Sequence, residues 1–335
     1  MSSKATVKDV AELAHVGTST VSRFVRGVKI KSAAAERIEA AIAQLHYVPD
    51  VSARALRSGR TNTIGVLIPK ASNVFFSHSV QQITRGARDL GLTVVLLTHE
   101  DSREEQARHL ATLSRYKVDG ILLTAVPGTT LAQVRSHVAD TPVVAYDSLL
   151  SAKMDAVLLD NRSGACQATR HLLDHGYRKI LCIAGRPEVY SYSERIRGYT
   201  ETMAGASRVP QVLMGADPAE LRRALTQHLR TQKKLPALLA LSDILALNVL
   251  AACDQLGLSA AERPPMLAFD DFDFAPHLSP PLSVLRQPIA WMVTAALELL
   301  LRRIEGSGQK KAQLSLHVGE LVLRRSCGCE PRVVG

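Results

Sequence analysis

The first 60 residues carry apolar side chains at helical spacing and show no strand-like alternation. Thr6 is placed to cap a first helix, in which the apolar positions are Val7, Val10, Ala11 and Ala14. After a break at 15–17, a second short helix is predicted over 18–25. A third is predicted over 32–46, with Ser32 as its cap. Two short helices joined by a turn of three or four residues are typical of a helix-turn-helix.

The pattern changes after one more predicted helical turn at 50–57 and a linker at 59–62. Apolar strands are predicted over 63–69, 93–98, 120–124, 143–146, 179–184, 237–241 and 266–269. Helices are predicted over 80–91, 103–116, 131–138, 163–175, 193–204, 221–232 and 243–256. This alternation predicts α/β architecture with doubly wound parallel sheets, and its extent indicates two such lobes.

Charge is unevenly distributed along the 335 residues, whose formal net charge is +10. Residues 1–60 hold ten Lys or Arg against five Asp or Glu. A concentrated basic segment fits a module that binds phosphates, although a merely solvated basic surface fits the charge equally well. We find neither a signal peptide nor a membrane-spanning run, and the five scattered cysteines suit a reducing compartment, so a cytoplasmic location is expected.

The second predicted helix would place polar and basic side chains on one outward face: Thr18, Ser19, Ser22, Arg23 and Arg26. Hydroxyl groups and guanidinium groups are the donors that reach base edges and phosphates in the major groove. The alternative is a small helical unit whose polar face only contacts water.

Motifs along nearly the whole chain resemble the LacI/GalR family of repressors. In the first part they are TVKDVAELA at 6–14, VGTSTVSR at 16–23, YVPD at 47–50 and ARAL at 53–56. Further along they are IGVLIP at 64–69, SNVFF at 72–76, VDGILL at 118–123, RIRGY at 195–199, FDD at 269–271 and LSVLRQP at 282–288. The resemblance implies a helix-turn-helix domain at 1–48, a hinge helix and linker at 49–62, and a two-lobed, periplasmic-binding-protein-like domain at 63–335 for effector binding and dimerisation.

The resemblance also implies roles in binding DNA. Thr18 and Ser19 match the residues that select bases, and Arg23 matches an arginine that reaches a guanine edge. Within the hinge helix, which folds on operator DNA in this family, Leu56 matches a leucine wedged into the minor groove. A buried core position is the alternative for this leucine. The neighbouring arginines match phosphate contacts: Arg54, Arg57 and Arg60.

Two positions depart from the family pattern in the turn of this motif. His15 stands where glycine or asparagine is usual, so a histidine must adopt a positive φ there. Gly17 replaces the usual serine that caps the recognition helix.

A ligand site is expected at the C-terminal ends of the strands, between the two lobes. Asp147 and Asp270 each follow a predicted strand, and their carboxylates could accept hydrogen bonds from the hydroxyl groups of a sugar. The resemblance adds an effector-contacting arginine, Arg195. The full set of candidate effector-binding residues is Phe75, Phe76, Asp147, Ser193, Arg195, Asp243 and Asp270.

Some of these assignments have alternatives. For Phe75 and Phe76 the alternative is lobe core, and for Asp243 it is helix capping. For Arg195 the alternative is a structural salt bridge, and for the two strand-end aspartates it is a structural role. Lys70 and Arg186 suggest a negatively charged effector, such as a sugar acid or sugar phosphate, although a surface lysine is the simpler explanation of Lys70. The stretch 209–220 has no aromatic residue where relatives often supply a second stacking ring.

The sequence favours a regulator over an enzyme. It contains no G-x-G-x-x-G, P-loop, G-x-S-x-G or H-E-x-x-H motif, so neither an enzyme nor a cofactor is expected. Cys327 and Cys329 lack partners at zinc-like spacing and are interpreted as part of the tail, with no metal site expected. A sugar-binding transport protein would have similar lobes but would lack residues 1–60. We therefore expect a repressor that acts as a homodimer on palindromic operator DNA, takes a carbohydrate-like effector and has no contact with membranes.

Overall fold

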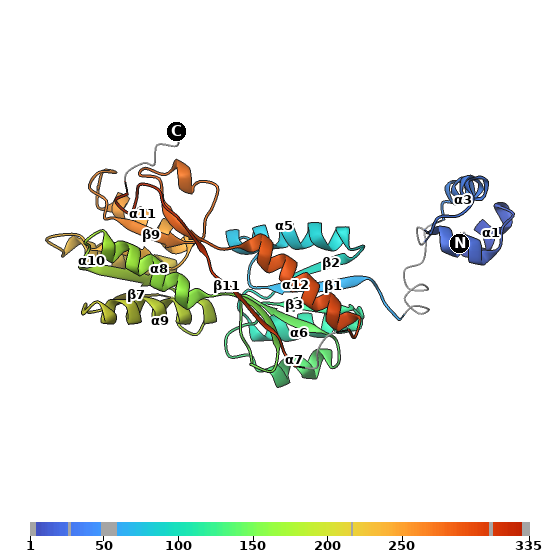
Figure 1. Ribbon diagram of the computed structural model, residues 1–335, viewed down its shortest axis with the longest axis horizontal. Helices are drawn as coiled ribbons and strands as arrows, with labels where there is room; N and C mark the ends of the chain where they lie inside the picture. Colours follow the sequence, from blue (N-terminus) through green and yellow to red (C-terminus); the bar gives the residue numbers. More distant parts are fainter. Residues whose placement is uncertain (1–4, 26–27, 48–58, 216, 308–310, 330–335) are drawn as a thin grey trace. The chain divides into compact units, whose positions relative to one another are not determined.

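The computed structural model describes residues 5–25, 28–47, 59–215, 217–307 and 311–329. The chain divides into two compact units, Met1–Thr61 and Asn62–Gly335 (Figure 1). Each unit has its own hydrophobic core, so each is described separately below.

The first unit is a bundle of three helices, α1 (Val7–Leu13), α2 (Thr18–Val25) and α3 (Ser32–Gln44). Thr6 caps α1 through a capping box in which its side chain accepts from the N–H of Asp9 and the Asp9 carboxylate accepts from the N–H of Thr6. The core consists of one small buried set: Val10, Ala11, Ala14, Val21, Ile38 and Ala41. This arrangement agrees with the predicted helix-turn-helix.

The turn between α1 and α2 depends on a histidine in the left-handed region. His15 has φ 51°, its N–H donates to the carbonyl of Glu12, and the N–H of Val16 donates to the carbonyl of Ala11 at 3.0 Å. These two bonds form a Schellman motif, which normally ends in glycine because a Cβ is unfavourable at positive φ. The positive φ expected for a histidine at this position is therefore present.

The start of α3 differs from the prediction. Lys31 is the N-cap residue and makes no side-chain capping bond. Ser32 is already the first helical residue, and its hydroxyl donates to Glu36 at 3.0 Å. Because a capping side chain must precede the first turn, Ser32 lies one position too late to cap the helix.

The second unit contains two six-stranded sheets, one in each lobe. The first sheet has the order β11-β5-β4-β3-β1-β2, and the strands pair in parallel. Its strands are β1 (Thr63–Ile68), β2 (Thr93–Thr98), β3 (Gly120–Leu123), β4 (Val143–Tyr146), β5 (Asp155–Leu159) and β11 (Leu314–His317). The helices of this lobe are α5 (Val74–Asp89), α6 (Arg103–Arg115), α7 (Leu131–Val138) and α12 (Ile289–Ile304).

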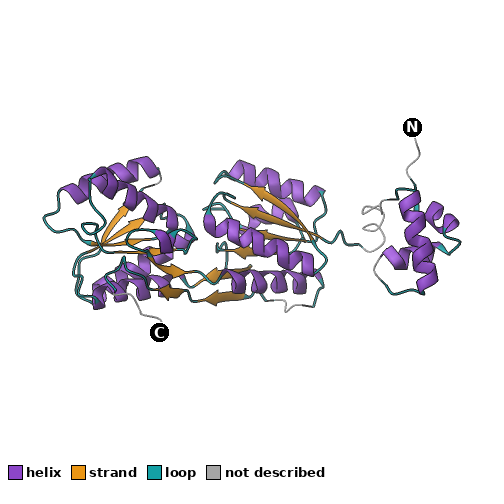
Figure 2. Cartoon of the chain, turned by 90° about the horizontal axis from the view of Figure 1, so that it is seen from above, coloured by secondary structure: helices purple, strands orange, loops and turns teal. Residues whose placement is uncertain are grey.

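Helices cover both faces of this sheet (Figure 2). Helices α5 and α12 pack together on one face, around Ile83, Met292 and Leu300. Helices α6 and α7 cover the other face through Leu113 and Val134. Strands buried on both faces read as continuous apolar runs, which is why their position could be recognised in the sequence.

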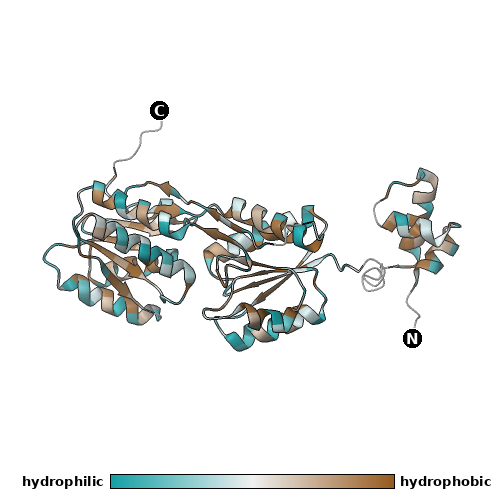
Figure 3. Ribbon diagram, turned by 60° about the horizontal axis from the view of Figure 1, so that its bottom comes forward, coloured by the Kyte–Doolittle hydropathy of each residue, from teal (hydrophilic) through white to brown (hydrophobic). Residues whose placement is uncertain are grey.

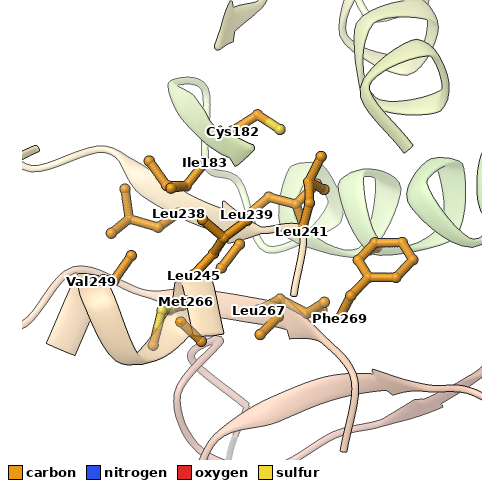
Figure 4. Close-up of a cluster of buried hydrophobic side chains, with 14 of the residues drawn as sticks. Cys182, Ile183, Leu238, Leu239, Leu241, Leu245, Val249, Met266, Leu267 and Phe269 are labelled. Carbon is orange, nitrogen blue, oxygen red and sulfur yellow. The ribbon is translucent and has the colours of Figure 1, made fainter. Parts of the chain in front are cut away.

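The second sheet has the order β12-β10-β9-β8-β6-β7, in which only the β10–β12 pair is antiparallel. Its strands are β6 (Ile180–Ala184), β7 (Gln211–Met214), β8 (Ala237–Ala240), β9 (Met266–Phe269), β10 (Ser283–Arg286) and β12 (Glu320–Val322). The helices are α8 (Asn161–Asp174), α9 (Tyr190–Gly205), α10 (Pro218–Arg230), α11 (Asp243–Gln255) and the short 3₁₀ helix η1 (Ala275–His277). Strands β8 and β9 lie at the centre of its core (Figure 4), and the central strands of both sheets are mainly hydrophobic (Figure 3).

The chain passes between the two lobes three times within the described residues. It leaves the first lobe after β5, returns between β10 and α12, and leaves again between β11 and β12. Two of these crossings lie side by side, because the N–H of Asp160 donates to the carbonyl of His317 at 2.7 Å. The lobes are therefore joined by three connecting segments that can act together as a hinge.

The predicted α/β fold with two doubly wound lobes is confirmed. The sequence pattern missed β5, β7, β10, β11, β12 and α12. Strands β7, β10 and β11 are short, and β7 and β11 are half-exposed, so each lacks the long apolar run of a central strand. Helix α5 also begins six residues before its predicted start, because Asn73 caps it directly after β1.

Candidate functional site

A cavity of about 180 Å³ in the second unit is lined by residues from both lobes. Asp147 follows β4 of the first lobe, and Asp270 follows β9 of the second. Both adopt the left-handed region, with φ 54° and 70°. Each donates its N–H to the neighbouring strand, to Val157 at 3.1 Å and to Leu285 at 3.0 Å. The predicted strand-end carboxylates thus lie at equivalent positions of the two lobes, and both line the cavity.

Arg195 occupies the second-lobe wall of this cavity and is buried. Its Nε donates to Asn161 Oδ1 at 2.7 Å, and its Nη1 donates to the carbonyl of Leu241 at 2.6 Å. Nη1 also lies 3.8 Å from Asp270 Oδ2, and the guanidinium carbon lies 4.3 Å from the centre of the Phe269 ring. A buried arginine held from four sides is a fixed positive charge, and it sets the electrostatics of the cavity.

The two strand-end carboxylates differ in their partners. Asp270 Oδ1 accepts a hydrogen bond from Gln287 Nε2 at 2.5 Å, while Asp147 Oδ1 is shielded from water and accepts none. Burial raises the pKa of Asp147 to about 7; the positive charge of Arg195 lowers it and the negative charge of Asp270 raises it. A buried acceptor without a partner indicates a missing donor, such as a ligand hydroxyl group.

Two phenylalanines at the start of α5 form the apolar wall. Asn73 caps the helix by accepting from the N–H of Phe76 at 3.2 Å. Phe75 stacks on Tyr146 with ring centres 6.0 Å apart and meets Phe76 edge-to-face at 5.0 Å. Both phenylalanines are buried in the core of the first lobe and also line the cavity. Both phenylalanines therefore belong to the core, and their contact with an effector stays a prediction.

The serine of helix α9 that lines the cavity is not the one expected from the sequence. Ser193 is exposed and is not among the residues that line the cavity. Ser191 is buried and lines the cavity together with Arg195. Residues four apart share one face of a helix, whereas Ser193 is rotated by about 200° from Ser191. The periodicity counted back from Arg195 could have identified Ser191.

Asp243 is neither the helix cap nor a lining residue of this cavity. Ser242 is the N-cap of α11, accepting from the N–H of Leu245, and it accepts a hydrogen bond from Tyr192 at 3.2 Å. Asp243 follows as the first helical residue; it is buried, and its Oδ1 has no hydrogen-bond partner. Burial, together with the carboxylate of Asp270, raises the pKa of Asp243 to about 6. The expected capping role belongs to Ser242.

The charges around the cavity do not favour an anion. Charged lining residues are four acids and one arginine: Asp101, Asp147, Glu188, Asp270 and Arg195. Lys70 and Arg186 are absent from the lining; they pair with Glu100 at 3.8 Å and with Asp101 at 2.9 Å. Lys70 therefore pairs away from the cavity, while Arg186 neutralises Asp101, one of the four lining acids.

The helix-turn-helix unit presents polar groups from α2. Thr18, Ser19 and Arg23 are exposed and Ser22 is half-buried, while Val21 faces the core. Gly17 occupies the N-cap position, where its carbonyl accepts from the N–H of Val21 at 3.2 Å and no side chain adds a cap. Of the other predicted DNA-contacting residues, Arg60 is exposed, and four lie outside the described residues: Arg26, Arg54, Leu56 and Arg57.

Among the described residues, no helix has the length and apolar character needed to cross a membrane.

Two family models match different parts of the chain. Residues 6–50 match bacterial regulatory proteins of the lacI family, and residues 169–327 match the periplasmic binding protein-like domain. These matches agree with the three-helix unit and with the two-lobed unit.

Whole-length relatives share the same organisation. The HTH-type transcriptional repressor PurR of Vibrio vulnificus is 31% identical over 327 residues, which cover 96% of this chain and 98% of the relative. The HTH-type transcriptional repressor PurR of Photobacterium profundum is 29% identical over 329 residues, with the same coverage of both chains.

Two solved structures are similar in fold to nearly the whole chain. A complex of the transcriptional regulator CelR with cellobiose is 27% identical with a TM-score of 0.70, covering 96% of this chain and 99% of the other. The lac repressor dimer bound to operator and the anti-inducer ONPF is 24% identical and shares the fold, with a TM-score of 0.84 over 97% of this chain and 99% of the other. The chain therefore belongs to the LacI family of bacterial regulatory proteins and is a DNA-binding transcriptional regulator.

Proposed function

We propose that the protein is a homodimeric repressor that reads a near-palindromic operator and responds to a small, neutral, hydroxyl-rich effector held in the cavity between its lobes. The observation that carries the proposal is the unpartnered Oδ1 of Asp147, a residue that lines the cavity together with Asp270 and Arg195. A ligand with several hydroxyl groups could donate to both carboxylates and accept from the guanidinium group.

The lining chemistry points to a monosaccharide or a compound of similar size. With Asp101 paired to Arg186, three lining carboxylates remain against Arg195, which disfavours a phosphate or carboxylate ligand. The rings of Phe75 and Phe76 offer an apolar wall for the C–H face of a sugar. The volume of about 180 Å³ lies below the roughly 300–1,000 Å³ usual for drug-sized ligands. The cellobiose complex of CelR supports the carbohydrate class.

The DNA-binding role rests on α2 and on the relatives that are named repressors. Thr18, Ser19, Ser22 and Arg23 are the proposed contacts with bases and phosphates. Arg26, Arg54, Leu56 and Arg57 remain proposed contacts, with Leu56 as the minor-groove wedge.

A dimer is proposed because one three-helix unit covers only half of such an operator. The lac repressor dimer on its operator supports this assembly. The second lobe also exposes apolar side chains on α11 and in the loop after β9: Ile244, Leu247 and Phe274. We propose that these side chains belong to an apolar patch that pairs with a second copy, since contiguous exposed apolar patches mark interaction surfaces.

The test is a thermal-shift screen of the full chain against neutral sugars, polyols, sugar acids, sugar phosphates and purines. A ligand at 100 times its Kd adds about 2.7 kcal/mol of stability, so a true effector is readily detected. We expect a neutral sugar or polyol to raise the Tm of the wild type and of Asp140→Asn, whose exposed carboxylate lies outside the cavity lining. The Asp270→Asn variant should not respond.

A stabilising ligand is then titrated against the protein on operator DNA. Release from DNA identifies an inducer, and tighter binding identifies a co-repressor. If only sugar phosphates or sugar acids stabilise the protein, the neutral-effector assignment is wrong. If a ligand stabilises Asp270→Asn as well as the wild type, its site lies elsewhere.

A further inference from the structure

Four side chains of metal-binding type meet on the second lobe, at the end of α8 opposite the effector cavity. His171 and His175 lie on the last turns of α8, and Cys327 and Cys329 lie near the end of the described chain. Their ligand atoms all lie within 4.8 Å of one another. The two pairs are far apart in the chain, so no local sequence pattern joins them.

The distances between the ligand atoms fit one small shared ion. His171 Nε2 lies 3.3 Å from Cys327 Sγ and 3.7 Å from Cys329 Sγ, and His175 Nε2 lies 3.2 Å from Cys329 Sγ. The two sulfur atoms are 3.3 Å apart. In a tetrahedral zinc site, bonds of about 2.3 Å to sulfur and about 2.0 Å to nitrogen imply edges of about 3.8 Å between sulfurs and about 3.5 Å between sulfur and nitrogen.

We propose that His171, His175, Cys327 and Cys329 bind one structural zinc ion. Two thiolates and two imidazoles are a donor set that selects Zn²⁺ in tetrahedral geometry. To reach that geometry, the two sulfurs need to separate by about 0.5 Å, and any pair of ligand atoms near the 4.8 Å limit needs to close to about 3.5 Å. Because all four ligands come from the protein, no open position remains for a substrate, so the ion would hold the fold together rather than catalyse a reaction.

The helix provides two ligands in fixed register. His171 and His175 are four residues apart, so their rings project from the same face, and the ring centres lie 4.7 Å apart. His175 is also the C-cap residue, so the site is at the negative end of the helix dipole, where a cation is stabilised.

The cysteine segment is shaped to present both sulfurs to that helix end. Gly328 lies between the cysteines with φ 92°, and a Cβ there would collide with the Tyr177 hydroxyl group. Tyr177 in turn donates to the carbonyl of Cys327 at 3.2 Å. Cys327 is buried, and the Ser283 hydroxyl donates to its sulfur at 3.1 Å, as a supporting hydrogen bond to a metal-bound thiolate would.

The ion would fasten the last described residues to α8. Without it, this segment is held to the sheet mainly through Ser326, whose hydroxyl donates to the carbonyl of Met266 and accepts from the N–H of Ser283, both at 2.7 Å. The spacing of one residue between the cysteines is shorter than the usual two to four, which is why the pair alone did not indicate zinc. The inference does not depend on the identity of the effector.

The experiment measures metal in the full-length protein purified without chelators. We expect about one zinc per chain by mass spectrometry of the elements. After removal of zinc under reducing conditions, titration with Co²⁺ should produce the visible absorption bands of tetrahedral cobalt and a thiolate-to-cobalt band, saturating at one equivalent. Of the five cysteines, two should become reactive toward a thiol reagent only after the metal is removed.

Matched variants locate the site. Cys329→Ser and His175→Gln should each lose the cobalt spectrum or weaken Co²⁺ binding more than tenfold, and their Tm should no longer respond to a chelator. Cys166→Ser is the control, because Cys166 lies on the same helix and bonds only to the carbonyl of Gly198 at 3.4 Å among the described contacts. His137→Gln, on α7 of the first lobe, is the histidine control.

Three results would overturn the proposal. The first is no zinc in the purified protein together with no cobalt spectrum in the reduced wild type. The others are unchanged metal binding in Cys329→Ser and His175→Gln, or an equal loss of metal binding in the control variants. Two thiols released by a reductant but not by a chelator would identify Cys327 and Cys329 as a disulfide pair instead.

Discussion

The two lobes each place an aspartate at the end of an equivalent strand, but the two aspartates differ in their hydrogen-bond partners. Asp147 and Asp270 each follow a parallel strand in the left-handed conformation and donate their N–H to the next strand. Asp270 is held by Gln287 and lies near Arg195, whereas Asp147 has a shielded oxygen without a partner. The second lobe thus fixes its strand-end aspartate with its own side chains, whereas the first lobe leaves one oxygen of its strand-end aspartate without a hydrogen bond.

This difference suggests an order of events in effector binding. A ligand would find its fixed hydrogen-bonding groups on the second lobe and would satisfy Asp147 when the first lobe closes on it. Closure would then be favoured only when the ligand is present, which is the differential stabilisation that a two-state regulator needs. The variants below test the contrast between the lobes, from the largest expected effect to the smallest.

Replacing Arg195 should destabilise the protein most. Arg195→Met leaves Asn161 Oδ1, the carbonyl of Leu241 and the carboxylate of Asp270 without their cationic partner. Loss of one member of a buried charged network costs about 3–5 kcal/mol. Urea unfolding of the wild type and variant measures this, with the exposed Arg197→Met as control, for which a change below about 0.5 kcal/mol is expected. A similar small change in both variants would mean that Arg195 does not organise the cavity.

Asp270→Asn should reduce effector affinity by about 100-fold, because hydrogen bonds to charged groups contribute about 1.5–3 kcal/mol and each 1.4 kcal/mol is a factor of ten. Operator affinity in the absence of effector should remain unchanged. Calorimetric titration of effector and gel-shift titration of operator separate the two. A parallel loss of DNA binding would indicate damage to the fold instead of the ligand site.

Asp147→Asn should weaken effector binding by about tenfold and yet stabilise the free protein by about 1 kcal/mol at pH 8. Because the pKa of Asp147 is raised to about 7 in the folded protein, the folded state binds more protons than the unfolded state between about pH 4 and pH 7. Ionisation of Asp147 therefore lowers the free energy of unfolding of the wild type as the pH rises through that window. The extra stability of Asp147→Asn over the wild type should vanish near pH 4. Unfolding at pH 4, 6 and 8 checks the sign; an advantage independent of pH would contradict it.

Effector binding near pH 7 should release about half a proton, since Asp147 is about half protonated at its pKa and ligand hydroxyl groups favour the carboxylate. Calorimetry in buffers of different ionisation enthalpy measures this release, and it should disappear in Asp147→Asn. Proton uptake would instead indicate an anionic ligand.

Gly17→Ser should have the smallest effect, stabilising the three-helix unit by a few tenths of a kcal/mol. A serine at this N-cap position would add a side-chain acceptor for the exposed N–H groups of α2, and a Cβ there meets nothing closer than 3.5 Å. Calorimetric scanning of the unit's transition measures the gain. A loss of stability would show that the N-cap geometry at Gly17 differs from the one described.

The sequence predicted those features that depend on local or regular spacing. The central strands are continuous apolar runs, and residues directly after them, such as Asp147 and Asp270, must each lie at the C-terminal edge of their own sheet. Ser193 was expected in place of Ser191 because the start of α9 was placed three residues too late. The histidine–cysteine cluster could not be predicted, because chain crossings bring together segments that share no spacing in the sequence.

The three crossings between the lobes have a consequence for synthesis of the protein. Strand β11 completes the sheet of the first lobe by pairing with β5, although it is made after β10 of the second lobe. On the ribosome, the first lobe must therefore wait with an open edge at β5 until nearly the whole chain has emerged. A prematurely terminated chain would carry an intact three-helix unit on an unfinished sensor, and could occupy operator half-sites without answering to the effector.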